Sequence, residues 1–137
     1  MVAAVGDFIA TRQARILLVE DDEVIREAIR RTLVEHGYRV EAAPGGTEGL
    51  EAIRTHPAFH LAILDLKLPG LSGSQLLRYL EQESPHTEVI VISGYSSEEV
   101  RVDAVAHGAF TVLEKPFSIT TLTHLVDRLL EPLRRSA

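Results

Sequence analysis

The stretch Ile16-Leu17-Leu18-Val19-Glu20-Asp21-Asp22 decides how this chain folds. Its first four residues are aliphatic and do not alternate with polar residues, which is typical of a β-strand that helices cover on both faces. Its last three residues are acidic. The stretch therefore predicts a buried parallel strand over 16–19 that ends at a group of carboxylates.

Four further strands and five helices are predicted along the rest of the chain. Short β-type runs cover 38–42, 61–64, 89–92 and 110–113. Helices are predicted over 23–36, 46–55, 73–82, 97–107 and 119–130, and Pro132 is expected to end or kink the last of them. Five consecutive β-α units in one chain indicate an α/β fold with right-handed crossovers. We expect a doubly wound, flavodoxin-like (βα)5 sheet with five parallel strands in the order 2-1-3-4-5.

The length and composition are those of one globular domain. The chain has 137 residues, of which 45% are hydrophobic, and this supports a single core. We predict an N-terminal extension over 1–14, one domain over 15–131 and a C-terminal tail over 132–137.

Charge and cysteine content exclude several classes of function. Fourteen Lys and Arg against twenty Asp and Glu leave a net charge of −6, so direct binding to nucleic acid or to a membrane surface is not expected. The absence of cysteine excludes disulfides, thiolate metal sites and cysteine nucleophiles. No apolar run reaches the roughly 20 residues of a membrane span, and the N-terminus lacks the features of a secretion signal. A cytoplasmic location is the expectation.

Polar side chains follow four of the predicted strands. Glu20 and Asp21 follow the first strand, Asp65 the third, Ser93 the fourth and Lys115 the fifth. In an open parallel sheet, ligands bind beyond the carboxyl ends of the strands where the strand order reverses, which here lies between strands 1 and 3. These five residues are therefore the candidate site.

Clustered carboxylates with no thiol or clustered histidine nearby favour Mg²⁺. Without a cation the carboxylates would repel and raise each other's pKa. Asp65 can be a metal ligand, a nucleophile or both. Asp22 and Glu23 are more simply explained as residues that cap the next helix. The six histidines show no metal-ligand spacing and are expected at helix ends or in solvent.

Four short motifs carry a resemblance to a known family. They are Ile16-Leu-Leu-Val-Glu20-Asp21-Asp22, Leu64-Asp65-Leu66-Lys67-Leu68-Pro69-Gly70, Val91-Ile92-Ser93-Gly94 and Glu114-Lys115-Pro116-Phe117. In this order, on a (βα)5 pattern, they resemble the receiver domains of two-component response regulators, the chemotaxis-regulator-like proteins. The resemblance covers residues from about 15 to 131.

The resemblance implies a role for each residue of the site. Asp65 would accept a phosphoryl group from phosphohistidine. Asp21 would bind Mg²⁺ directly and Glu20 through water, while Asp65 and the main-chain carbonyl of Lys67 would complete the protein ligands. Ser93 would hydrogen-bond the phosphoryl group and Lys115 would pair with it, which is phosphoryl transfer by positioning and charge neutralisation.

The implied function is a phosphorylation-controlled signalling domain rather than an enzyme in the usual sense. It would have intrinsic Mg²⁺-dependent self-phosphorylation and autodephosphorylation. A sensor histidine kinase or a histidine phosphotransfer protein would be the donor, and a downstream protein or output domain the target. Receivers often form homodimers through their helix 4, strand 5 and helix 5 face. The kinase, the output and the question of whether this is a single-domain regulator or part of a larger protein stay open.

One position departs from the family pattern. Three residues before Lys115, many receivers carry an aromatic residue whose rotation reports phosphorylation, whereas this chain has Val112. Phe110, expected on the same strand face, or Tyr95 after the Ser-Gly turn could replace it. Ordinary packing is the alternative for both.

Two other functions remain as alternatives. A haloacid-dehalogenase-like phosphatase also phosphorylates a strand-end Asp with Mg²⁺, but it needs a second Asp where this chain has Lys67. A pseudo-receiver would bind partners without being phosphorylated. The intact set of acidic residues, Ser93 and Lys115 argues against it.

Overall fold

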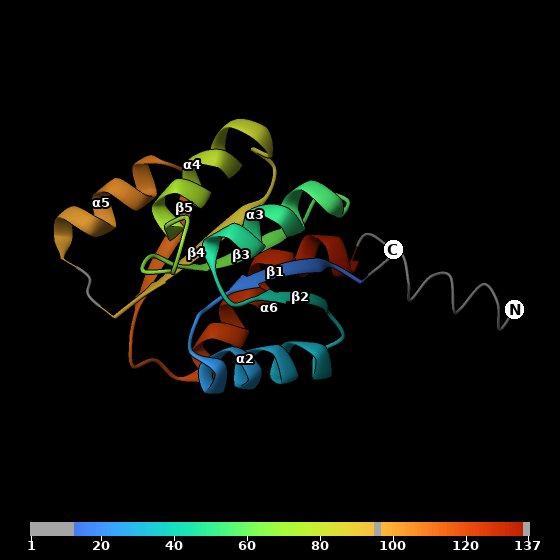
Figure 1. The fold of residues 1–137 in the computed structure, drawn as a ribbon. Helices are drawn as coiled ribbons and strands as arrows, with labels where there is room; N and C mark the ends of the chain where they lie inside the picture. The colour runs from blue at the N-terminus through green and yellow to red at the C-terminus, as the bar shows by residue number, and fades with distance from the viewer. Residues whose placement is uncertain (1–12, 95–96, 136–137) are drawn as a thin grey trace, which may run out of the picture.

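The computed structural model describes residues 13–94 and 97–135, and in this part of the chain five strands alternate with five helices (Figure 1). In chain order they are β1 (Arg15–Val19), α2 (Glu23–Glu35), β2 (Arg39–Ala43), α3 (Gly46–Thr55), β3 (Leu61–Asp65), α4 (Gly73–Glu83), β4 (Glu88–Ser93), α5 (Glu98–Ala106), β5 (Ala109–Glu114) and α6 (Ile119–Arg135). Each predicted strand and helix is present, and their ends differ from the prediction by at most one residue except at the end of α6. Hydrophobic periodicity was therefore a sufficient guide to the elements.

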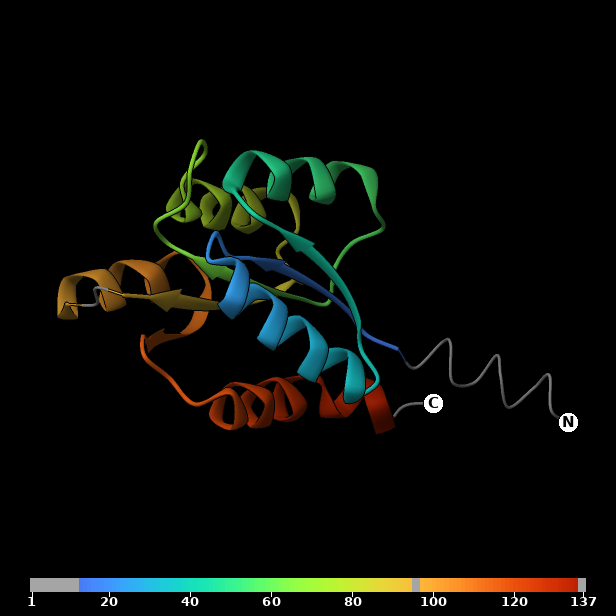
Figure 2. The ribbon, with the colours of Figure 1, turned by 60° about the horizontal axis from the view of Figure 1, so that its bottom comes forward.

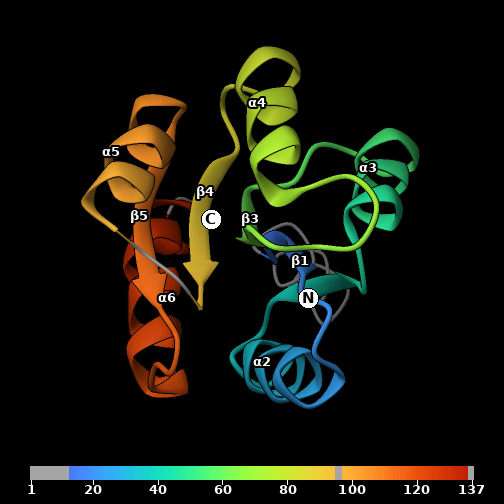
Figure 3. The same ribbon diagram turned by 60° about the vertical axis from the view of Figure 1, so that its left-hand side comes forward.

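The strands form one parallel sheet in the order β2-β1-β3-β4-β5, as the sequence predicts. Helices α3, α4 and α5 cover one face and α2 and α6 cover the other (Figures 2 and 3). All strands point the same way, so their carboxyl ends share one edge. The direction in which successive strands are added to the sheet reverses between β1 and β3, and this places the candidate site between these two strands.

The central strand β3 shows why the strand sequences lack alternation. All five of its residues are buried. Ala62 and Leu64 pack toward α3, α4 and α5, while Leu61 and Ile63 pack toward α2 and α6. Both faces of β3 are in the core, and each fully buried Leu or Ile contributes about 1.5–3 kcal/mol from burial.

Side-chain caps begin three of the helices. Asp22 caps α2, where its carboxylate accepts the N–H of Ile25, and this confirms the capping role predicted for Asp22. Ser72 and Gln75 form a reciprocal capping box at α4, and Ser97 caps α5. Each cap satisfies main-chain donors that the first turn of a helix leaves free.

The last helix differs from its prediction. Helix α6 continues beyond residue 130 and past Pro132 to Arg135, so the proline does not end it. A proline removes one main-chain hydrogen bond, and a helix can continue past it with a local change in direction. Among the described residues, no helix has both the length and the apolar character needed to cross a membrane.

The prediction that Phe110 shares a strand face with Val112 is wrong. Ala109 pairs with Val89 but Thr111 pairs with Ile90, so one extra residue lies in β5 at this point. The irregularity turns Phe110 outward, with 53% of its surface exposed, whereas Val112 is 2% exposed. A bulge of this kind changes the face on which later residues lie. The other candidate, Tyr95, lies outside the described residues.

Three of the six histidines lie at helix ends, as predicted. They are the C-caps His36, His56 and His107. His86 and His124 are exposed. His60 is different, because it is half-buried before β3 and its Nδ1 accepts the main-chain N–H of Arg15 at 2.9 Å.

Candidate phosphorylation and metal site

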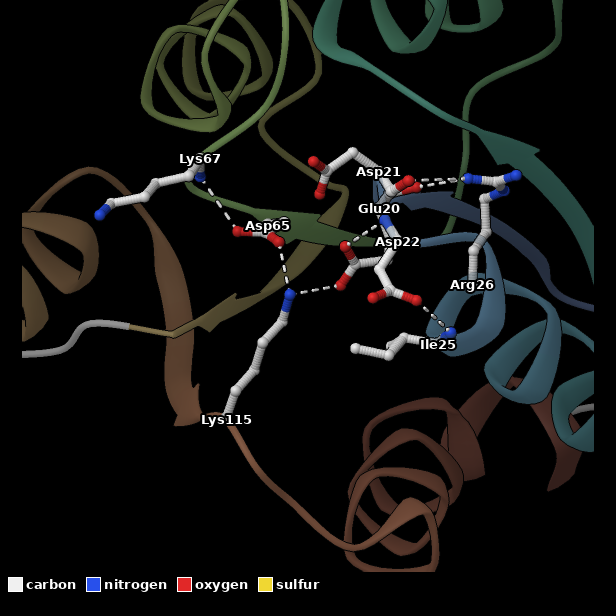
Figure 4. A network of polar contacts seen from close by, with 8 residues as sticks. All are labelled: Glu20, Asp21, Asp22, Ile25, Arg26, Asp65, Lys67 and Lys115. Carbon is white, nitrogen blue, oxygen red and sulfur yellow. Dashed lines mark hydrogen bonds and ion pairs between the residues drawn. The ribbon is translucent and has the colours of Figure 1, made fainter.

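Three carboxylates meet at the carboxyl edge of the sheet. Glu20 and Asp21 directly follow β1, and Asp65 is the last residue of β3. One oxygen from each side chain lies within 4.8 Å of the others (Figure 4). The predicted convergence of Glu20, Asp21 and Asp65 is therefore present in the fold.

Lys115 is the residue after β5, and its side chain extends into the same site. Its ammonium lies 2.7 Å from Glu20 Oε1 and 2.7 Å from Asp65 Oδ2. Its main-chain N–H donates to the carbonyl of Ser93 at 2.8 Å, which extends the β4–β5 pairing by one step. This main-chain contact directs the lysine side chain toward β1 and β3 (Figure 4).

The charged side chains of this cluster are buried to different degrees. Glu20 is completely buried and Asp65 is 3% exposed, while Asp21 is exposed. Burial raises the pKa of Glu20 above its ordinary value, although the contacts with Lys115 and the Asp22 N–H act in the opposite direction. Desolvation works to lower the pKa of Lys115, but its contacts with Asp65 and Glu20 outweigh that effect and raise the pKa.

Main-chain contacts hold the acidic pair in place. The N–H of Asp22 donates to Glu20 Oε2 at 3.0 Å. The Arg26 guanidinium donates to the carbonyl of Glu20 at 2.9 Å and to that of Asp21 at 3.5 Å (Figure 4). Arg26 is a residue of the site that the sequence did not single out. A cationic residue close to the amino-terminal end of a helix is unfavourable for the helix dipole, and this was a signal that it has another partner.

The segment after Asp65 turns back toward its carboxylate. The N–H of Lys67 donates to Asp65 Oδ1 at 3.0 Å. The Lys67 side chain is exposed and points away from the carboxylates (Figure 4). Lys67 therefore contacts Asp65 through its main-chain N–H, whereas the resemblance assigns its main-chain carbonyl to the metal.

Ser93 ends β4 beside the other site residues. It is 2% exposed, and the preceding residue, Ile92, pairs with Asp65 across the sheet. Ser93 pairs in turn with Glu114, next to Lys115. All the candidate residues thus reach one edge of the sheet, with Asp65 between the acidic pair and Ser93.

The residues present fit a magnesium ion. The cluster offers carboxylate oxygens from three residues, and hard oxygen ligands are those that Mg²⁺ prefers. The buried Glu20 Oε1 lies 2.7 Å from the Lys115 ammonium, so its negative charge is compensated within the site.

Sequence comparison supplies the observation that decides the family. The family model described as "Response regulator receiver domain" matches residues 16–127. The chain belongs to this family. The receiver is 40% identical over 120 residues to the transcriptional activator protein PfeR of Pseudomonas aeruginosa, a match that covers 88% of this chain and 39% of PfeR. It is 37% identical over 122 residues to the response regulator MprA of Mycobacterium ulcerans, covering 89% of this chain and 51% of MprA.

Solved structures agree with the fold of this receiver. The CheY-like receiver domain protein from Methanospirillum hungatei superposes with a TM-score of 0.83 at 32% identity, covering 91% of this chain and 99% of that one. The BeF3-activated DrrB receiver domain gives a TM-score of 0.80 at 30% identity, covering 87% and 98%. The doubly wound fold and its strand order are those of CheY-like receivers.

The receiver spans at most about half the length of the curated relatives described above. Its membership of the two-component response regulators is established by the family match and by these relatives. The alternative of a haloacid-dehalogenase-like phosphatase finds no support in the same comparisons.

Proposed function

We propose that Asp65 of this receiver accepts a phosphoryl group from a phosphohistidine on a sensor histidine kinase or a histidine phosphotransfer protein. An oxygen of the Asp65 carboxylate attacks phosphorus, a P–O bond forms and the P–N bond breaks. The histidine nitrogen leaves with the electron pair and takes up a proton. The product is an acyl phosphate on Asp65, which changes the affinity of the domain for a downstream protein or output domain.

The proposal rests on one arrangement, in which the Asp65 carboxylate lies between an acidic cluster and an ammonium. Glu20 and Asp21 bring carboxylate oxygens within 4.8 Å of Asp65, and Lys115 Nζ lies 2.7 Å from Asp65 Oδ2. Phosphoryl transfer needs positive charge around the transferred oxygens and a fixed nucleophile, and little other chemistry.

Mg²⁺ would be held by Asp21 directly, by Glu20 through water, by Asp65, and by the main-chain carbonyl of Lys67. When bound, the ion neutralises negative charge on the phosphoryl oxygens. Lys115 would stabilise negative charge on the phosphoryl group, because its ammonium contacts Asp65 Oδ2. The Lys67 N–H orients Asp65 through Oδ1. Ser93 would donate its hydroxyl to the phosphoryl group from the adjacent strand end.

Small phosphodonors test the proposal without knowledge of the kinase. The protein is incubated with Mg²⁺ and acetyl phosphate or phosphoramidate, and intact mass is measured. We expect one phosphoryl adduct in the native chain and none in Asp65→Asn, which keeps the size of the side chain but removes the nucleophilic oxygen. Asp22→Asn is the matched control, because Asp22 caps α2 and asparagine is an equally good N-cap.

Each outcome has a distinct meaning. An adduct that is present in Asp22→Asn and lost in Asp65→Asn supports the proposal. An adduct that persists in Asp65→Asn places the acceptor elsewhere. Turnover of an added phosphomonoester supports a phosphatase, and the absence of any adduct in the native chain supports a pseudo-receiver.

We propose that a second copy of this chain binds the face formed by α5, β5 and α6, which corresponds to the face through which receivers often form homodimers. Val102 and Val105 on α5 and Phe110 on β5 are exposed large hydrophobic side chains there. Sedimentation of the native chain and of Phe110→Ser, with and without phosphodonor, tests this surface. Equal sedimentation of both proteins in both states would count against it.

A further inference from the structure

The loop after the phosphoacceptor packs against the beginning of α3. This loop, residues 66–72, connects β3 to α4 and includes Lys67. Leu66, Leu68 and Leu71 pack their side chains against the core beneath α3 and α4. These side chains hold the loop against the core, and the main chain of the loop also contacts α3.

Gly46, the first residue of α3, lies directly against the main chain of this loop. Its N–H donates to the carbonyl of Pro69 at 3.2 Å. A Cβ on Gly46 would lie 1.5 Å from the carbonyl oxygen of Leu71 and 2.4 Å from its carbonyl carbon. Two main chains meet here with no room for a methyl group, so any other residue must displace the loop or the helix.

Further glycines allow the same close packing around the loop. Gly70 has φ +73°, and a Cβ there would lie 2.6 Å from Thr47 Oγ1 on α3. Gly73 donates its N–H to the Leu66 carbonyl at 3.1 Å, and a Cβ on Gly73 would lie 2.0 Å from the carbonyl oxygen of Asp65. The loop is thus held between the start of α3 and the start of α4.

We infer that Gly46 is a positioning residue for the metal site, because its contact with the Leu71 and Pro69 main chain sets the position of the loop that carries the Lys67 carbonyl. The inference rests on the proposed function, which makes that carbonyl a ligand of Mg²⁺. Gly46 touches neither the metal nor the phosphoryl group. Residues that orient metal ligands commonly change metal affinity about 10–100-fold when they are altered.

Gly46→Ala tests the inference by Mg²⁺ titration calorimetry on the full chain. We expect about a tenfold or larger rise in the dissociation constant for Mg²⁺. Gly49→Ala is the matched control on the same helix, because a Cβ there would approach the side-chain atoms Val19 Cγ2 at 2.9 Å and Leu76 Cδ1 at 3.2 Å rather than the loop. The control should lose stability but keep the native Mg²⁺ affinity.

A milder variant covers the case in which Gly46→Ala fails to fold. A Cβ on Gly45 would lie 2.8 Å from the flexible Glu48 carboxylate and 3.2 Å from the Pro69 carbonyl. Gly45→Ala should therefore fold and weaken Mg²⁺ binding severalfold, by less than Gly46→Ala. Phosphorylation by acetyl phosphate should then need more Mg²⁺ to reach the native maximal rate.

The result separates the inference from the function on which it rests. If the native chain binds no Mg²⁺, the proposed metal site is wrong. If the native chain binds Mg²⁺ and the affinity is unchanged in both Gly46→Ala and Gly45→Ala, Gly46 does not position the site. An equal loss of affinity in Gly49→Ala would likewise overturn the inference, because the loss would then follow from general destabilisation.

Discussion

The ammonium of Lys115 donates to Asp65 Oδ2 over 2.7 Å, although the two residues lie 50 positions apart in the chain. The same ammonium lies 2.7 Å from the buried Glu20 Oε1. One lysine therefore separates two carboxylates that would otherwise face each other across the sheet edge. This arrangement makes Lys115 both a structural ion-pair partner and a competitor for any divalent cation.

Lys115→Met should destabilise the protein in the absence of Mg²⁺. The substitution leaves buried carboxylate oxygens without their cationic partner, at a cost of about 1–3 kcal/mol in unfolding free energy. Added Mg²⁺ should restore much of this loss and should bind more tightly than to the native chain. Urea denaturation with and without Mg²⁺ measures both effects.

Lys67→Met is the control for that substitution. The Lys67 side chain is exposed and points away from Asp65 (Figure 4), so we expect the unfolding free energy to change by less than about 0.5 kcal/mol. Equal stability of Lys115→Met and Lys67→Met would show that the Lys115 ion pairs do not stabilise the fold.

Mg²⁺ should raise the melting temperature of the native chain. A ligand that binds only the folded state adds about 2.7 kcal/mol at one hundred times its dissociation constant. Asp21→Asn removes the exposed carboxylate of the cluster and should reduce this gain without preventing folding. Thermal unfolding in Mg²⁺ and in EDTA checks the prediction, and identical melting temperatures for the native chain would contradict the site.

His60 should make stability depend on pH. Burial, and then the charge of Arg15, lower the pKa of His60 below 6.5. The hydrogen bond that its Nδ1 accepts from the Arg15 N–H also requires the neutral ring. The neutral ring is favoured in the fold. Its stabilising contribution is therefore complete above pH 6.5 and is lost as the pH falls from there toward the folded-state pKa.

His60→Asn should flatten the dependence of unfolding free energy on pH just below pH 6.5. The slope due to one proton cannot exceed about 1.4 kcal/mol per pH unit. Urea denaturation at several pH values measures the slope, with the exposed His86→Asn as a control. If the native chain and His60→Asn show the same slope of unfolding free energy against pH, protonation of His60 does not contribute to the pH dependence of stability.

The acyl phosphate should decay slowly, over minutes or longer. The side chains expected to flank the path of the attacking water are Lys67, two residues after the acceptor, and Tyr95, two residues after Ser93. Tyr95 lies outside the described residues, so its contribution stays a sequence prediction. Tyr95→Ala should lose the phosphoryl group faster, which intact mass followed over time will measure. An unchanged decay rate would contradict the prediction.

The conformational response should depend on Ser93 more than on Val112. Val112 is 2% exposed and has no ring to rotate, and Phe110 lies outside the core. Ser93→Ala should therefore uncouple partner binding from phosphorylation more than Val112→Ala does. The affinity of the phosphorylated and unphosphorylated forms for a partner is the measurement. A larger loss of coupling in Val112→Ala would assign the response to β5 instead.

Local sequence was enough to predict the fold and which residues lie together at the carboxyl edge of the sheet. Strand β3 reads as a continuous apolar run because both of its faces are covered, and Asp65 stands at its end. A parallel sheet places the carboxyl ends of its strands on one edge, so Asp65 and the acidic pair were expected to meet there. These features depend on periodicity and on position within a strand, which are properties of neighbouring residues.

Only the tertiary structure decided how distant segments contact one another. The close approach of Gly46 to Leu71, the contact of Arg26 with the carbonyls after β1, and the irregularity that turns Phe110 outward depend on the packing of separate elements. Such contacts have no local signature, because a glycine in a helix or an arginine on its surface is compatible with many neighbours. Their positions follow from close packing, which is settled only when all the helices and the sheet are in place.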